Sequence, residues 1–244
     1  IPDTPVYLEM THTPLHIDAP LKTTLEQYYT TANLAYSQGD DGISTFNFQY
    51  YRESPGDVAP YHEPPFNMFE HIGDSNWVAN QDHHYFLGAV WNHPPLAKRP
   101  LPKTFYEGQT NSFTIKMSPE QYRNGKLRIR AEKSLGSSTW SAKFNGNNLS
   151  ETTDVSEIYY NPYPDAQGDP EDYRAWLVPK EYYQSGDNTI KLTLNSGTSA
   201  KIIWIDLITP SELVTDPVLY MNASKPGSVP DLYWKPEIGH GDGL

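Results

Sequence analysis

The spacing of hydrophobic residues between positions 5 and 51 predicts a strand, a helix and a second strand. In residues 6–12, Val6, Leu8 and Met10 alternate with more polar positions, which is the period of a β-strand. Residues 41–51 form a second short run of the same kind. The helix between them has its apolar positions on one face, at Leu25, Tyr28, Tyr29, Ala32 and Ala35. A strand, helix and strand of these lengths predict a parallel pair joined by a crossover helix.

The ends of this helix are marked by local signals. Thr23 followed by Glu26 has the spacing of a capping box, in which the two side chains satisfy amides of the first turn. Gly39 suits the left-handed position just beyond a helix. We therefore expect the helix to begin near Thr23 and to end before Gly39.

From about Thr104 the hydrophobic period changes to two, and turn signals such as Asn145-Gly146 separate the runs. The predicted strands are residues 113–117, 127–132, 140–146, 155–160, 173–178, 188–194 and 201–208. In the second of these, Arg128 and Arg130 alternate with apolar residues, so the arginines are expected to face solvent. This succession predicts an antiparallel β-sandwich of the jelly-roll type.

The segment between the two patterns is rich in proline and glycine. A long loop follows residue 51, Phe66, Phe69 and Ile72 recur at helical spacing, and Asp74 is placed to cap a further turn. Residues 83–91 are predicted as a strand, and the prolines of residues 92–102 indicate a linker. We place an α/β domain at 1–95, the all-β domain at 96–210 and an extended tail at 211–244.

Composition excludes several classes of function. The net charge of −12 and the pI near 5.0 argue against a nucleic-acid partner. The chain has no cysteine, and no apolar run reaches the roughly 20 residues that span a bilayer. Its 18 tyrosines and 6 tryptophans outnumber 8 phenylalanines, which suits ligand-facing surfaces and also suits ordinary Tyr-rich strands.

Glu9 is the main candidate for chemistry. It lies near the carboxyl end of the first predicted strand, where parallel sheets place their active sites. The alternative is a surface or salt-bridged carboxylate. Side chains expected to gather beside it and bind a polyhydroxylated ligand are His12, His16, Asn47, Gln49, Tyr50, Tyr51 and Arg52.

The metal-binding potential of the sequence is limited. Six of the eight histidines lie within residues 12–84 and invite a zinc hypothesis. None has the spacing that puts two ligands on one helical face, and Pro14 interrupts His12 and His16. Oxygen ligands of the kind that calcium uses occur at Asp165, Asp169, Glu171 and Asp172. The same loop can equally be a solvated acidic loop. We therefore predict no cofactor, with calcium as the alternative.

Several runs resemble a known family. PVYLEMTHTP, ANLAYSQGDDGISTFNFQYYRE and HIGDSNWVANQDHHYFLG resemble the last strands and closing helices of glycoside-hydrolase-like barrels of polysaccharide-degrading bacteria. NGNNL, DYRAWLVPKEYYQSGDNTIKLTL and IIWIDL resemble the jelly-roll domain that follows such barrels. The resemblance implies the C-terminal portion of a (β/α)8 barrel followed by a sandwich. It also implies that Glu9 is the nucleophile of retaining members and that the second carboxylate would precede Ile1.

The leading hypothesis is therefore the C-terminal portion of a glycoside hydrolase acting on a polysaccharide or oligosaccharide, secreted or periplasmic. The alternatives are a non-catalytic carbohydrate-binding protein and an accessory structural domain. Expected partners are a carbohydrate ligand and a segment that completes the barrel. That segment would be an N-terminal fragment of the same precursor, cleaved before Ile1, or another chain. No nucleic acid or membrane partner is expected.

Overall fold

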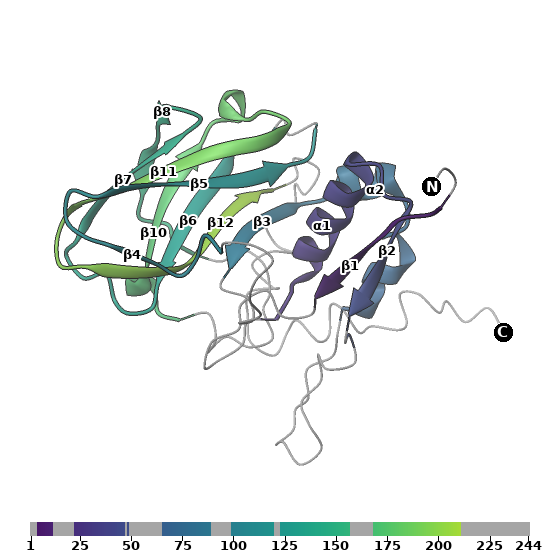
Figure 1. Cartoon of the computed structure of the whole chain (residues 1–244), viewed down its shortest axis with the longest axis horizontal. Coiled ribbons are helices and arrows are strands. Elements are labelled where there is room, and N and C mark those ends of the chain that lie inside the picture. Colours follow the sequence, from purple (N-terminus) through teal and green to yellow (C-terminus); the bar gives the residue numbers. More distant parts are fainter. Residues whose placement is uncertain are drawn as a thin grey trace, which may run out of the picture.

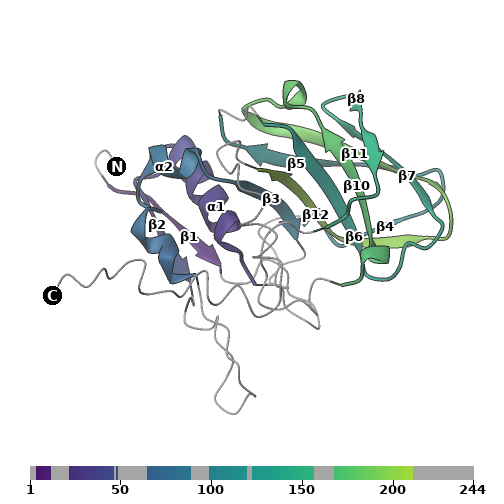
Figure 2. The ribbon, with the colours of Figure 1, turned by 180° about the vertical axis from the view of Figure 1, so that it is seen from behind.

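The computed structural model describes residues 4–11, 22–46, 48, 65–88, 99–119, 123–156 and 168–210. Figure 1 shows a β-sandwich beside a smaller part built from two strands and short helices. Figure 2 gives the reverse view, and in both views the long helix α1 lies between the sandwich and the two strands. No helix in these ranges is long and apolar enough to cross a membrane.

The smaller part confirms the predicted parallel pair. Strand β1 (Tyr7–Thr11) pairs in parallel with β2 (Gly42–Phe46), and helix α1 (Leu25–Ser37) connects them. The 3-10 helix η2 (Phe66–Glu70) and helix α2 (Ser75–Ala79) follow, and the Asp74 side chain accepts hydrogen bonds from two amides of α2, as the sequence predicted. One parallel pair does not confirm a (β/α)8 barrel.

The capping box of α1 is one residue later than the sequence predicted. Thr24 and Gln27 form it, with Gln27 N donating to Thr24 Oγ1 and Thr24 N donating to Gln27 Oε1. The Thr23 hydroxyl instead donates to the carbonyl of Thr11 at 2.8 Å, so it ties the start of the helix to the end of β1. At the other end, Gly39 has φ 93°, which confirms its predicted role as the residue that ends the helix.

The sandwich consists of two antiparallel sheets. One has the order β3-β12-β6-β10-β9, with β4 also on β12, and the other has the order β5-β11-β7-β8. The first sheet contains β3 (His83–Gly88), β4 (Lys103–Phe105), β6 (Gly125–Ala131), β9 (Ser150–Thr152), β10 (Tyr173–Val178) and β12 (Ala200–Thr209). The second contains β5 (Thr110–Met117), β7 (Thr139–Phe144), β8 (Asn147–Asn148) and β11 (Gly186–Ser196). The long strands alternate between the sheets, so the predicted antiparallel sandwich is confirmed.

The core between the sheets uses one face of each long strand. Trp140 of β7 and Trp176 of β10 are buried there, with Phe105, Phe113 and Phe144 among their neighbours. Asn145 and Gly146, both with positive φ, make the tight turn between β7 and β8 that the Asn-Gly pair predicted. The predicted strand over 155–160 is not formed at its two described residues, 155 and 156; the other four lie outside the described ranges.

Strand β3 belongs to the sandwich sheet. The sequence placed residues 83–91 in the first domain, but His83–Gly88 pairs antiparallel with the Trp204–Thr209 half of β12, and Tyr85 contributes to the sandwich core. The reason is that β12 is long enough to hold β4 along its first half and β3 along its second. A domain boundary at residue 95 therefore separates β3 from the strand with which it pairs.

Helix α1 is buried on more than its apolar face. Tyr28, Tyr29 and Ala32 pack with Met10 and residues of η2 and α2, as an amphipathic helix on a sheet predicts. Gln27, Thr30 and Asn33 are also buried, on the side that faces β3. The helix is thus packed between two layers, and its second buried face is polar.

Candidate functional site

Glu9 is exposed on the face of the β1–β2 pair that points away from α1. Met10 is buried against α1, and alternation along the strand puts Tyr7 and Glu9 on the opposite face. Glu9 lies opposite Ser44 of β2 in the parallel register. Tyr7 is 61% exposed and Phe46 is 46% exposed on the same face. The carboxylate is therefore accessible, between two accessible aromatic rings.

The carboxyl end of β1 is held by the helix that follows it. The Thr23 bond to Thr11 places the N-terminus of α1 beside this end. Just beyond β2, Phe48 contacts Phe66 and Phe69 edge to face, with ring centroids 5.5 and 5.2 Å apart, and both η2 rings are partly exposed. The contact of Phe48 with Tyr28 of α1 places this group on the helix side of the strand pair, so the exposed rings that share the face of Glu9 are those of Tyr7 and Phe46. Exposed aromatic rings suit contact with sugar rings.

Of the side chains predicted for this site, Glu9 lies within the described ranges. His12, His16, Asn47, Gln49, Tyr50, Tyr51 and Arg52 lie outside them, so their gathering around Glu9 stays a prediction. Asp165, one of the four residues considered for calcium, also lies outside. Glu171 accepts a hydrogen bond from Ser134, and Asp172 accepts one from the Asp169 amide.

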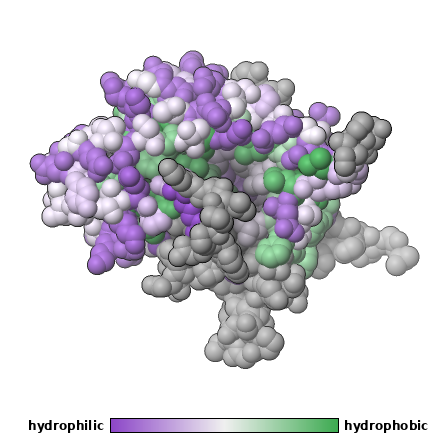
Figure 3. Space-filling view, viewed as in Figure 1, coloured by the Kyte–Doolittle hydropathy of each residue, from purple (hydrophilic) through white to green (hydrophobic). Residues whose placement is uncertain are grey.

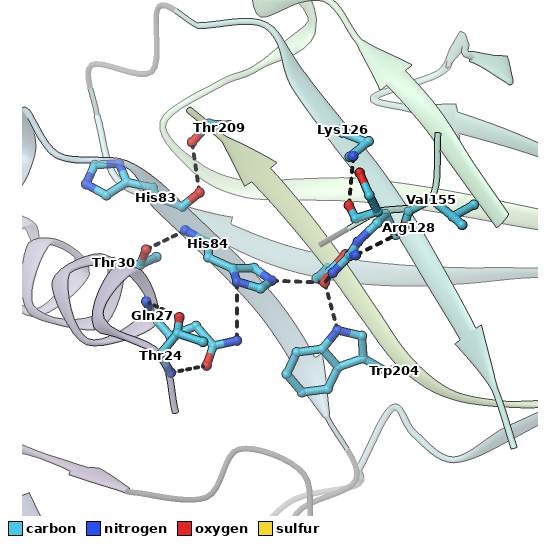
Figure 4. A network of polar contacts seen from close by, with 12 residues as sticks. Thr24, Gln27, Thr30, His83, His84, Lys126, Arg128, Val155, Trp204 and Thr209 are labelled. Carbon is cyan, nitrogen blue, oxygen red and sulfur yellow. Dashed lines mark hydrogen bonds and ion pairs between the residues drawn. The ribbon is translucent and has the colours of Figure 1, made fainter. Parts of the chain in front are cut away.

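A second polar cluster, which the sequence did not predict, joins α1 to the sandwich (Figure 4). The Thr30 hydroxyl accepts the His84 amide at 2.7 Å, and Gln27 Nε2 lies 3.4 Å from His84 Nδ1. Asn33 donates to the Ser118 hydroxyl at 2.7 Å. Three polar side chains on one face of α1 thus bind β3 and the end of β5.

The cluster continues through His84 into the sandwich. His84 Nε2 lies 2.9 Å from Asp206 Oδ2, which also accepts from Trp204 Nε1 at 2.9 Å. Arg128 donates from Nε to Asp206 Oδ1 at 3.0 Å and bonds the second oxygen through a terminal nitrogen. The Asp206 carboxylate is fully buried and is surrounded by donors from three strands.

The geometry fixes the protonation of this cluster. Gln27 Oε1 accepts the Thr24 amide, so its Nε2 faces His84 and must donate to Nδ1. His84 then carries its proton on Nε2 and donates it to Asp206. Burial alone would raise the pKa of Asp206, but the Arg128 charge and the His84 bond hold that pKa below its ordinary range. The histidine and aspartate are both buried, so this cluster positions α1 on the sandwich and offers no access to substrate.

The prediction for Arg128 and Arg130 is therefore wrong. Both are buried, and Arg128 lies opposite Asp206 in the pairing of β6 with β12. The face of this sheet that points away from the sandwich core is also buried, so Arg128 and Asp206 bond each other there. The signal in the sequence was Asp206 itself, because a single carboxylate within the apolar run IIWIDLI requires a buried partner.

Glu26 of α1 has a carboxyl group whose pKa is strongly shifted. It is half-buried in the first turn, and burial raises its pKa from 4.5 to about 7, with the nearby Asp82 carboxylate adding to the shift. Perturbed carboxyls of this kind are candidates for functional sites, and they also make stability depend on pH.

Replacing Glu26 with glutamine should stabilise the protein at pH 8 and leave it unchanged at pH 4. Because the pKa is raised on folding, the stabilisation due to this group is complete below pH 4.5 and is lost as the pH rises to about 7. The neutral variant avoids that loss, so we expect a gain of about 1–3 kcal/mol at pH 8. Urea denaturation at both pH values measures the difference. An equal effect at the two pH values would contradict the assignment.

Comparisons with known proteins give distant structural likenesses. No protein-family model matches the sequence, and no curated protein matches it. A β-porphyranase of glycoside hydrolase family 86 from the human gut bacterium Bacteroides plebeius matches at 15% identity and TM-score 0.35, over 52% of this chain and 20% of that protein. Dimeric latent PorU from Porphyromonas gingivalis matches at 12% identity and TM-score 0.29, over 53% and 12%.

The CBM36-1 domain of a multidomain xylanase from the hindgut metagenome of Trinervitermes trinervoides is matched over 96% of its length and 52% of this chain, at 11% identity and TM-score 0.28. The match to the β-porphyranase spans about a fifth of the length of that protein. Parts of carbohydrate-active proteins are thus among the similar structures. All three scores are below 0.5, so the function has to be argued from the site.

Proposed function

We propose that this chain is the C-terminal portion of a secreted or periplasmic glycoside hydrolase acting on a polysaccharide or oligosaccharide, with Glu9 as its nucleophile or as a carboxylate that contacts the sugar. The observation that carries the proposal is the exposed Glu9 on a parallel strand pair, on the face that the crossover helix leaves uncovered. The sequence resemblance of this unit to the end of a hydrolase barrel supports the same assignment.

The exposed face itself needs a covering layer. Parallel sheets are normally covered on both faces, and this face carries the exposed aromatic rings of Tyr7 and Phe46. Within the described chain, β1 and β2 pair only with each other. We therefore include in the proposal a further strand-bearing segment, from the same precursor or another chain, that extends this sheet and supplies the second carboxylate that glycoside hydrolysis requires.

Replacing Glu9 with glutamine in the complete protein should lower polysaccharide hydrolysis by about a thousandfold or more, because a neutral amide cannot act as nucleophile or stabilise positive charge in the transition state. The melting temperature should change little, since the side chain is exposed. Release of reducing ends from a panel of polysaccharides measures the effect.

Glu70 offers a matched control for this experiment. It is an exposed carboxylate on η2, and its replacement with glutamine should leave hydrolysis unchanged. Unaltered turnover in the Glu9 variant would exclude the catalytic role. Loss of folding in that variant would show instead that the carboxylate is structural.

A further inference from the structure

One end of the sandwich carries a pocket that lies apart from Glu9. Its walls are Thr104 at β4, residues 132–135 and 138 at the end of β6 and in the loop to β7, and residues 198–201 at the turn into β12. The volume is about 200 Å³. None of the described residues that line it is aromatic, and most carry hydroxyl or charged groups.

The walls of this pocket are held in place by the protein itself. Gly197 packs so closely on Ser138 that an added Cβ would come within 2.7 Å of the serine Cβ. The Ser138 hydroxyl donates to the Leu135 carbonyl and accepts Trp140 Nε1 at 3.0 Å. The loop from β6 to β7 and the turn from β11 to β12 are thus joined, which preforms the pocket before any ligand binds.

Several polar groups at the pocket remain available to a ligand. The hydroxyls of Thr104, Thr198 and Ser199 make no hydrogen bond to another described residue, and neither does the Lys133 ammonium group. Beside them, Lys201 and Glu132 form an ion pair at 2.6 Å. The wall therefore presents hydroxyls that both donate and accept, a carboxylate that accepts and ammonium groups that donate.

We propose that this pocket binds one neutral pyranose residue of a glycan. The inference rests on the proposed carbohydrate-active function and assigns to the sandwich a binding site of its own. A space of about 200 Å³ equals roughly seven water molecules of about 30 Å³, which is room for one sugar ring and too little for a longer segment. Vicinal hydroxyls match a carboxylate and an ammonium held side by side, and the charges of the Lys201–Glu132 pair offset each other at that part of the wall, which suits a neutral sugar.

Titration of the ¹⁵N-labelled chain with glucose, galactose, xylose and glucuronate tests the proposal. With at least one neutral sugar, amide shifts should change at residues 132–138 and 198–201. The dissociation constant should lie on the order of 1–10 mM, because an open pocket without an aromatic platform binds a single ring weakly. Shifts produced by glucuronate alone would overturn the assignment to a neutral sugar.

Two variants and one control make the test specific. Ser199→Leu fills the pocket and should abolish binding, and Glu132→Gln should weaken it at least about fivefold. Asp187→Asn alters the exposed pair with Lys116 at the opposite end of β11 and should leave binding unchanged. Equal affinity in all three variants, or shifts elsewhere in the chain, would overturn the pocket site. So would the absence of binding at 100 mM sugar. Hydrolysis that depends on Glu9 is measured separately, so this site and the proposed activity can fail independently.

Discussion

Replacing Asp206 with alanine should lower the free energy of unfolding by about 3–5 kcal/mol, because it leaves the Arg128 guanidinium buried without its counter-charge. The same change removes acceptors from Trp204 and His84, so it also loosens α1 from the sandwich. Chemical denaturation monitored by tryptophan fluorescence measures the effect.

A double variant separates the charge pair from the remainder of the network. Arg128→Met combined with Asp206→Leu removes both charges and should cost clearly less than the sum of the single changes, since a paired buried charge is most destabilising when only one partner is removed. Asp187→Asn, which breaks an exposed pair on the other sheet, should change stability by less than about 0.5 kcal/mol. Additive effects at Arg128 and Asp206 would contradict the coupling.

A sandwich fragment that begins at the predicted domain boundary should be much less stable than the sandwich in the whole chain. A fragment of residues 96–210 lacks β3, so it exposes one edge of β12 and removes Tyr85 from the core. Loss of a buried aromatic side chain costs about 3–5 kcal/mol, which corresponds to more than 10 °C in melting temperature for a domain of this size.

The matched control for this cut is a fragment of residues 80–210, which retains β3. Calorimetry of the two fragments should show one cooperative transition for the longer fragment and a much lower or broader one for the shorter. Similar melting temperatures would mean that β3 contributes little to the stability of the sandwich. The predicted boundary near residue 95 would then define a stable domain.

Local signals in the sequence predicted the elements well. The parallel crossover, the Asp74 cap, the end of α1 at Gly39 and the Asn145-Gly146 turn all depend on neighbouring residues, and all are present. The start of α1 was wrong by one residue because Thr23 and Thr24 are both good caps. The contact of Thr23 with the end of β1, which decided between them, is not local.

The polar cluster could not be derived in the same way. His84 and Asp206 are 122 residues apart, and they meet only because β12 lies between β3 and β6. Alternation within a strand indicates which residues share a face, but it does not show what covers that face. Arg128 therefore looked like a solvent-facing residue, although the sheet register places it against a buried carboxylate.

For the candidate site, the sequence predicted the position of Glu9 on a strand of a parallel pair and its accessibility. Both properties follow from the hydrophobic period of the strand and from the order of strand, helix and strand along the chain, which short segments determine. The side chains expected around it come from the segments after β1 and β2, whose paths depend on longer-range packing. The sandwich pocket was not predicted, because it forms where a loop and a turn about 60 residues apart meet.

The position of β12 in its sheet has a consequence for how the chain folds during synthesis. His83 and Thr209 bond each other across 126 residues, and at about 5–20 residues per second the ribosome needs about 6–25 s to make the intervening chain. During that time β3 and β6 have no strand between them, so the strand edges that later pair with β12 lack their partner. The nascent chain is therefore most exposed to aggregation and most dependent on chaperones just before its final sandwich strand emerges.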